Sequence, residues 1–215
     1  DYEALKARRD AALAAGKLFG IGFACGVEPS GSNMAYVTLA QTPEERAKAG
    51  GRSGGAAVAT VALDPSGAAT VTLDSTPAGQ GHATAAAQIV ADGLGMRPEE
   101  VQVVTTMDTQ NGDWSLASGN YANRFSAIVV DAIVESTDRI AMKLKAVAAD
   151  MLEVAPDDVE LSGGRARIAG VPDDGIALAR VAAATHWHPA GLPEGLSPGL
   201  REAATLSPDV LDAPD

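Results

Sequence analysis

The chain has 215 residues, a formal net charge of −12 and an aromatic content of only 4%. This length suits one good-sized domain, and the acidic charge argues against a nucleic-acid partner or an anionic membrane. No apolar run is long enough to cross a bilayer, and the charged first residues do not resemble a signal peptide. We therefore expect a cytoplasmic protein.

The N-terminal quarter predicts a helix, a strand and a connector. Residues 1–15 have the pattern of an amphipathic helix that ends near Gly16. The apolar run 18–27 (LFGIGFACGV) is predicted to be a short buried strand, so its Cys25 is expected to be a buried structural thiol. As the only cysteine, it excludes an intrachain disulfide and a cysteine-held iron–sulfur cluster within this chain. After a turn and a strand at 34–40, we expect a flexible connector at 41–55.

The rest of the chain mixes strand and helix signals. The predicted elements are a hairpin of 56–63 and 68–74 around the turn 64–67, a helix at 83–94, a strand at 101–105, a long helix at 124–153, a hairpin of 158–161 and 165–169, and a helix at 175–185. The helices are rich in alanine, so they should pack closely. We predict an α+β fold with mixed sheets, hairpins and packed Ala-rich helices. Residues 186–215 lack a clear periodicity and are predicted to be an extended tail that contacts a partner subunit.

A glycine-rich turn lies between the strand at 68–74 and the helix at 83–94. Its sequence, residues 76–84, is TPAGQGHAT. Such a junction directs unpaired backbone N–H groups at one point and attracts a phosphate or another anion. Gly79 and Gly81 allow a ligand to approach the backbone closely, and the Gln80 amide can donate and accept hydrogen bonds. An ordinary tight turn before a helix remains the alternative.

A second polar loop approaches the long helix. Residues 116–126 (LASGNYANRFS) follow Asp108-Thr109 and a loop of Gly, Asn, Asp and Ser. Arg124 in this loop is suited to a pyrophosphate, which its planar guanidinium can bind through two hydrogen bonds. The alternative is an exposed arginine that pairs with Asp108 or Asp113.

The order of these motifs resembles the second molybdopterin-binding domain of the xanthine dehydrogenase and aldehyde oxidase family. That family has a GQGH-type loop, a QIxAxxLG helix, a VxVxxxDT strand and a GxxxSR-type loop. The matching segments here are 79–82 (GQGH), 88–95 (QIVADGLG), 101–109 (VQVVTTMDT) and 119–124 (GNYANR). The resemblance covers roughly residues 1–185, which would form a partial second molybdopterin-binding domain.

The resemblance implies which residues contact the cofactor, molybdopterin cytosine dinucleotide with molybdenum. The cofactor-binding residues carried over from the two loops are Ala78, Gly79, Gln80, Gly81, His82, Ala122, Asn123, Arg124, Phe125 and Ser126. Asn123 stands where serine is usual in the family. A purely structural role for His82 stays open. Metal binding by His186 and His188, or a metal or acid–base site at Asp108 and Asp113, is a weaker alternative.

One family motif is missing, and its absence shapes the functional hypothesis. The family's catalytic base is a glutamate in a GEAG-type motif, and no such motif occurs in these 215 residues. We therefore assign no catalytic residue and no metal ligand to the chain. The resemblance implies a split molybdenum subunit, in which a partner chain shares the cofactor and carries the glutamate. It also implies [2Fe–2S] and FAD on other subunits.

The implied reaction is oxidation of an aldehyde or an N-heterocycle, a small-molecule substrate, with water-derived oxygen. A hydratase of the same family and a non-catalytic assembly subunit are the alternatives. A free-standing α+β enzyme that uses the glycine turn for a nucleotide phosphate is a third possibility from outside the family.

Overall fold

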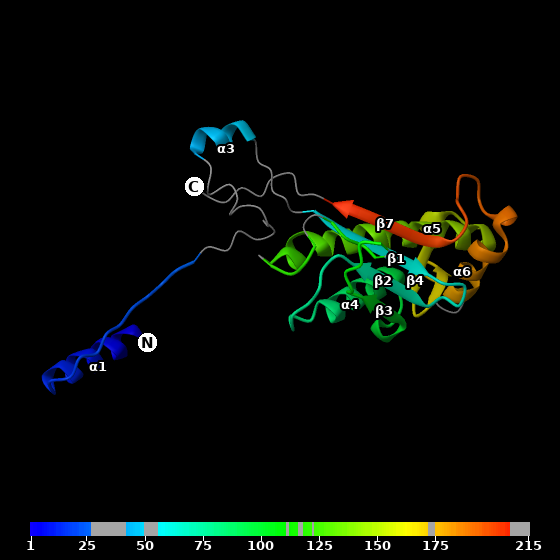
Figure 1. Cartoon of the computed structure of the whole chain (residues 1–215). Coiled ribbons are helices and arrows are strands. Elements are labelled where there is room, and N and C mark those ends of the chain that lie inside the picture. Colours follow the sequence, from blue (N-terminus) through cyan, green and yellow to red (C-terminus); the bar gives the residue numbers. More distant parts are fainter. Residues whose placement is uncertain are drawn as a thin grey trace.

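The computed structural model describes residues 1–26, 42–49, 56–110, 112–115, 118–121, 123–171 and 175–206. Its main body is α+β, with helices packed against a four-stranded sheet (Figure 1). The helices are α1 (Tyr2–Ala14), α3 (Pro43–Ala49), α4 (His82–Leu94), α5 (Val130–Leu152) and α6 (Leu178–Trp187). The strands are β1 (Ala57–Leu63), β2 (Ala69–Leu73), β3 (Val101–Val104), β4 (Val159–Ser162), β5 (Arg165–Ile168), β6 (Ile176–Ala177) and β7 (Leu200–Leu206). The predicted fold class is confirmed.

The central sheet has the strand order β3-β2-β1-β7. β1 pairs antiparallel with β2 and with β7, whereas β2 and β3 are parallel and are joined through α4. Parallel strands place their carboxyl ends at the same edge of a sheet. The loops that follow β2 and β3 therefore begin at the same edge. The glycine-rich turn follows β2 directly, so this edge is where a binding site is expected.

The hairpin of β1 and β2 forms as predicted. Asp64 starts the turn, and its carboxylate accepts hydrogen bonds from the backbone N–H groups of Ser66 at 2.8 Å and Ala68 at 3.1 Å. Gly67 follows with φ of +84°, a conformation that favours glycine. β2 alternates buried and half-buried residues, as a strand with one face on the core does.

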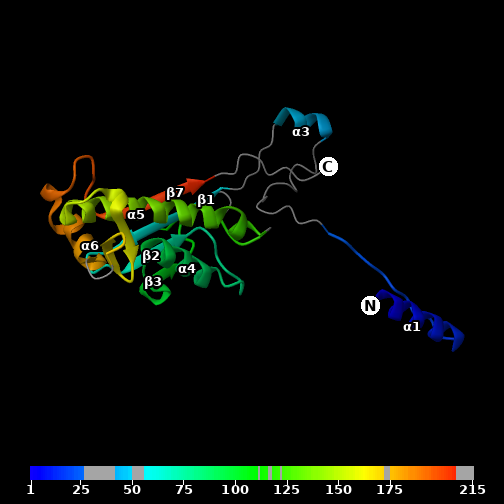
Figure 2. The same ribbon diagram turned by 180° about the vertical axis from the view of Figure 1, so that it is seen from behind.

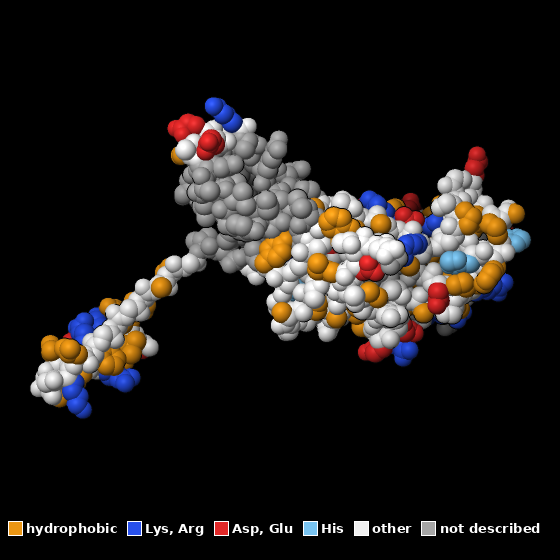
Figure 3. Space-filling model, viewed as in Figure 1, with side chains coloured by type: hydrophobic (Ala, Val, Ile, Leu, Met, Phe, Trp, Pro, Cys, Tyr) orange, Lys and Arg blue, Asp and Glu red, His pale blue; other side chains and the backbone are white. Residues whose placement is uncertain are grey.

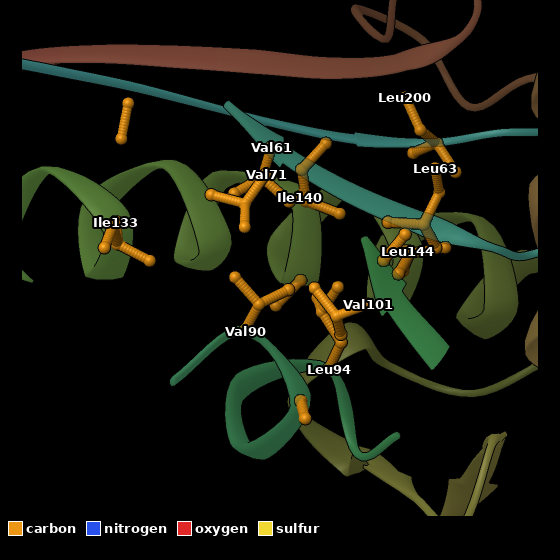
Figure 4. Packing of buried hydrophobic residues seen from close by; sticks show 14 of the residues in the cluster. Val61, Leu63, Val71, Val90, Leu94, Val101, Ile133, Ile140, Leu144 and Leu200 are labelled. Carbon is orange, nitrogen blue, oxygen red and sulfur yellow. The ribbon is translucent and has the colours of Figure 1, made fainter. Parts of the chain in front are cut away.

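Small residues let α4 and α5 approach each other closely, as the Ala-rich sequence predicts. A Cβ on Gly93 of α4 would lie 2.6 Å from the Thr137 side chain of α5. Branched residues fill the space between these helices and the sheet, including Val61, Val71, Val90, Ile140 and Leu144 (Figure 4). The result is a closely packed frame of two helices and a sheet that carries the polar loops.

The long helix and the second hairpin agree with the sequence with small differences. Residues 125–129 form a π-helical turn that leads into α5, and β6 precedes α6 within the predicted helix 175–185. β4, β5 and β6 make a separate three-stranded sheet. The backbone N–H of Gly164 in this hairpin donates to the carbonyl of Gly95 at 2.7 Å, which ties the hairpin to the end of α4.

The N-terminal predictions are confirmed only for the helix. α1 forms but has no buried residue, and it lies apart from the sheet in the views of Figures 1 and 2. Residues 18–26 have no regular structure, so the predicted buried strand is wrong there. Cys25 is exposed rather than buried. Leu18 and Phe23 are 96% and 74% exposed, and this part of the surface shows hydrophobic side chains in Figure 3. An apolar run alone cannot form a strand without a neighbouring strand to pair with.

The connector predicted at 41–55 contains a helix in its described part. Thr42 and Glu45 form reciprocal bonds, from the Glu45 N–H to the Thr42 hydroxyl and from the Thr42 N–H to the Glu45 carboxylate. This is a capping box, and Pro43 is the first residue of α3. The TPEE sequence carried that signal. The strand predicted at 34–40 lies outside the described residues.

The prediction of an extended tail is wrong over residues 200–206. β7 pairs with the whole of β1, and its Leu200 and Ala204 are buried. β7 is therefore an edge strand of the central sheet. Residues 207–215 lie outside the described part of the chain.

Candidate cofactor-binding site

The glycine-rich turn gives α4 an N-terminus without a side-chain cap. Gly79 and Gly81 have φ of +105° and +80°, and Gly81 is the N-cap residue but makes no side-chain capping bond. The first N–H groups of a helix have no partner within it, so those of residues 82–84 are directed at the space before α4. No atom lies within 4 Å of a Cβ built on either glycine, so this space is open to a ligand.

The second loop meets this turn through an aromatic stack. Phe125, at the start of the π-helical turn, packs flat on His82, with ring centroids 4.0 Å apart and an interplanar angle of 6°. Asn123 before it has φ of +49°, which asparagine tolerates better than most residues. This stack therefore connects the loop that follows β2 with the segment that leads into α5.

A cavity of about 360 Å³ lies between the two loops. The residues that line it are Gln80, Gly81, His82, Ala85, Asn120, Tyr121, Asn123, Phe125 and Ser126. None of these carries a carboxylate, ammonium or guanidinium group. Amides, a hydroxyl, a phenol and an imidazole surround the space, which is a set of neutral hydrogen-bonding groups.

His82 is held in a neutral form by its surroundings. Its side chain is buried at 6% exposure, and this burial lowers the pKa of the imidazole below its ordinary value. The Oγ of Ser75 lies 3.4 Å from Nδ1 of His82. A neutral imidazole stacked on Phe125 forms one wall of the cavity and adds no charge to it.

Arg124 does not face the cavity, contrary to the role predicted for it. Its guanidinium is fully buried, and Nη2 donates to Oδ2 of Asp74 at 2.6 Å. Nε donates to the carbonyl of Ala56 at 3.2 Å, and Nη2 also donates to that oxygen. The alternative pairing with Asp108 or Asp113 is also wrong, because the acceptor is Asp74 at the end of β2.

The structure gathers most of the remaining predicted site residues around one cavity. Six of them line it: Gln80, Gly81, His82, Asn123, Phe125 and Ser126. Ala78 and Gly79 lie in the adjoining turn, and Ala122 lies outside the described residues. Sequence reasoning missed Ala85, Asn120 and Tyr121. The run of amides in GNYANR was the available signal for Asn120.

The alternative metal sites find no support within the described residues. No group of three or more His, Cys, Asp or Glu side chains there is placed to hold a metal ion. His186 is engaged elsewhere, because its Nε2 lies 3.1 Å from the carbonyl oxygen of Leu63. Asp113 accepts a hydrogen bond from Thr60 at 3.0 Å. Among the described residues, no helix is long and apolar enough to span a membrane.

Two loops on an α+β frame thus form a cradle of neutral hydrogen-bonding groups at the N-terminus of α4. Comparison with known proteins identifies its family. Residues 1–210 match the family of molybdopterin cofactor-binding domains, and the chain belongs to it.

Several relatives support this assignment. The chain is 33% identical over 200 residues to the nicotine 6-hydroxylase large subunit of Paenarthrobacter nicotinovorans, covering 93% of this chain and 23% of that protein. It is 32% identical over 148 residues to the carbon monoxide dehydrogenase large chain of Hydrogenophaga pseudoflava, covering 69% of this chain and 18% of the other.

Among solved structures, quinoline 2-oxidoreductase from Pseudomonas putida 86 superposes with a TM-score of 0.70 at 30% identity, covering 97% of this chain and 25% of that one. The CO dehydrogenase of Oligotropha carboxidovorans gives a TM-score of 0.62 at 27% identity, with 72% of this chain and 18% of the other covered. The chain thus spans a quarter or less of the length of these relatives and corresponds to part of a molybdenum-cofactor-binding large subunit.

Proposed function

We propose that the cavity between the two loops binds molybdopterin cytosine dinucleotide in a molybdenum hydroxylase. The observation that carries this proposal is the cavity itself, which is lined by neutral hydrogen-bonding groups at the uncapped N-terminus of α4. Pyrophosphate and dithiolene groups are anionic. Backbone N–H groups and side-chain amides can hold them without bringing an unpaired charge into the site.

The side chains that line the cavity include both hydrogen-bond donors and hydrogen-bond acceptors for the cofactor. The Oε1 of Gln80 accepts the N–H of Ala78 at 2.7 Å, which orients the amide and makes its NH₂ group available as a donor to the cofactor. The hydroxyl of Ser126 donates to the carbonyl of Asn123 at 3.0 Å, so its oxygen is the part that can accept from a ligand. The N-terminal N–H groups of α4 suit a phosphate oxygen.

The chemistry itself requires groups outside these residues. When bound, the cofactor supplies the metal centre at which a substrate carbon is oxidised with water-derived oxygen. We propose that a glutamate base on a partner chain moves the proton in that reaction, and that [2Fe–2S] and FAD on other subunits carry the electrons. The chain's own residues bind and orient the cofactor, and the neutral His82 and Phe125 exclude water beside it. A cytoplasmic location belongs to the same proposal.

An N-heterocycle is the proposed class of substrate. The names of two relatives, nicotine 6-hydroxylase and quinoline 2-oxidoreductase, contain N-heterocyclic compounds. Carbon monoxide dehydrogenases are also among the relatives, so the shared part of the fold serves the cofactor rather than one substrate. Purified native assembly should reduce an electron acceptor when given an electron-poor N-heterocycle. Hydration of a substrate without electron transfer would instead identify a hydratase.

Replacement of Gln80 tests the cofactor role directly. In Gln80→Ala, we expect the molybdenum and cytosine nucleotide recovered per chain from the native assembly to fall by up to about tenfold, because the loss of one hydrogen bond to a charged group weakens binding by about that factor. Gln88→Ala is the matched control, because Gln88 is also exposed but lies further along α4, outside the cavity. Thermal unfolding of both variants should stay near that of the native chain. Equal occupancy in the two variants would refute the proposed role of the loop.

A further inference from the structure

The two cavity loops are joined by a buried ion pair beneath them. Arg124 and Asp74 are both fully buried. Asp74 is the first residue after β2, where the loop to α4 begins, and Arg124 directly precedes Phe125. The salt bridge therefore connects the starting points of the two segments that carry His82 and Phe125.

Further hydrogen bonds tie a third segment to the same pair. The N–H of Gly119 donates to the backbone carbonyl of Asp74 at 3.1 Å, and Nη1 of Arg124 lies 3.4 Å from the carbonyl oxygen of Gly119. The Ser115 hydroxyl donates to Oδ2 of Asp74 at 2.7 Å. Together with Ala56 at the entry to β1, these contacts surround the guanidinium with acceptors from separate parts of the chain.

We propose that Arg124 and Asp74 are positioning residues, which hold the two loops in the register that the cofactor requires without contacting it. This inference rests on the proposed function of the cavity. Neither residue lines the cavity, and both are inaccessible to a ligand. Their effect on the site passes through their chain neighbours, Phe125 on one side and the turn that leads to His82 on the other.

The arrangement is hard to explain as a device for stability alone. A buried ion pair costs the desolvation of two charges, and well-packed apolar residues of similar volume are often at least as stable. Within the described residues, Oδ1 of Asp74 has no hydrogen-bond partner, so the pair is not fully satisfied. Apolar side chains cannot replace one property of the guanidinium. Its planar group holds N–H donors in fixed directions, and these donate to acceptors in three separate segments.

The test compares variants that keep the fold but change the geometry. Arg124→Lys keeps the charge and loses the planar fork, and Asp74→Asn keeps the size and loses the charge. The double variant Arg124→Met, Asp74→Leu removes both charges. It leaves no unpaired buried charge, so it should still fold if a single variant does not. Leu200→Ala is the control for lost stability, because Leu200 is buried in β7 away from the cavity.

Two measurements on the full chain report the loop geometry apart from global stability. The first is the NMR titration of the His82 ring, whose pKa should rise toward its ordinary value when the stack on Phe125 opens. The second is the exchange rate of the Gly119 amide, which should increase by about tenfold or more when its partner carbonyl moves. We expect both changes in Arg124→Lys, Asp74→Asn and the double variant, and neither in Leu200→Ala.

Cofactor occupancy in the native assembly completes the test. We expect all three variants of Arg124 and Asp74 to lower molybdenum and cytosine nucleotide content, as Gln80→Ala does. If Gln80→Ala lowers occupancy and the variants of Arg124 and Asp74 leave it unchanged, the inference is wrong and the proposed function stands. If Gln80→Ala also has no effect, the proposed function fails, and the pair is then judged by the His82 titration alone. An unchanged titration in the double variant overturns the positioning role.

Discussion

His82 shows how a single residue combines structure and site. The sequence left open whether this histidine is structural or binds the cofactor, and its position in the structure is compatible with both roles. It is buried, it stacks on Phe125, and it lines the cavity. A charged imidazole would lose hydration in this position, so the native chain favours the neutral ring.

This preference predicts a dependence of stability on pH. The pKa of His82 in the folded chain lies below its unfolded value of 6.5. The unfolded state therefore binds more protons once the pH falls below about 6.5, and stability declines as the pH is lowered further, by at most ~1.4 kcal/mol per pH unit for one proton. Denaturant unfolding between pH 8 and pH 5 measures this slope.

A matched pair of variants assigns the slope to this residue. His82→Gln should remove that part of the pH dependence, whereas His188→Gln should keep it, because His188 is exposed. A slope that survives in His82→Gln would show that another group titrates.

Arg124 shows what a sequence cannot specify at this scale. Its position in a polar loop before a helix predicts a ligand contact, and the nearby Asp108 and Asp113 predict a local pair. The structure pairs it with Asp74, 50 positions away in the sequence. The parallel crossover from β2 to β3 lies between these two residues in the chain. The available signal was Asp74 itself, a carboxylate directly after an alternating strand.

At the scale of elements, periodicity predicts the parts that form their own local contacts. The β1–β2 hairpin, α4 and the β4–β5 hairpin all have close sequence neighbours as partners, and each was predicted within a few residues. β7 was missed because its partner, β1, is distant in the sequence and because Pro and Gly precede it. The run 18–27 was predicted to be a strand, but its described residues, 18–26, have no strand to pair with in the described chain.

The placement of β7 in the sheet is tested by two neighbouring alanines. Ala204 is buried opposite Ala59, whereas Ala203 is exposed opposite Thr60. Ala204→Glu should cost roughly 3 kcal/mol or more, because it buries an unpaired charge. Ala203→Glu should stay within about 0.5 kcal/mol, since edge strands accept exposed charges. Thermal or urea unfolding measures both. If the two substitutions had equally small effects, residues 200–206 would be a tail after all.

At the scale of the whole molecule, the chain corresponds to part of a molybdenum-cofactor-binding large subunit. It spans 23% of the nicotine 6-hydroxylase large subunit and 25% of the quinoline 2-oxidoreductase chain that it matches. Its N-terminal residues Leu13, Leu18 and Phe23 are exposed.

The most direct test of this account is a density map of the native assembly with its cofactor bound. We predict the pyrophosphate of the cofactor within hydrogen-bonding distance of the N–H groups of residues 82–84, and its pterin or nucleotide beside Gln80 and Asn123. Arg124 should remain buried against Asp74 in the same map. A cofactor that lies elsewhere, with no contact to the cavity between the two loops, would contradict the central claim.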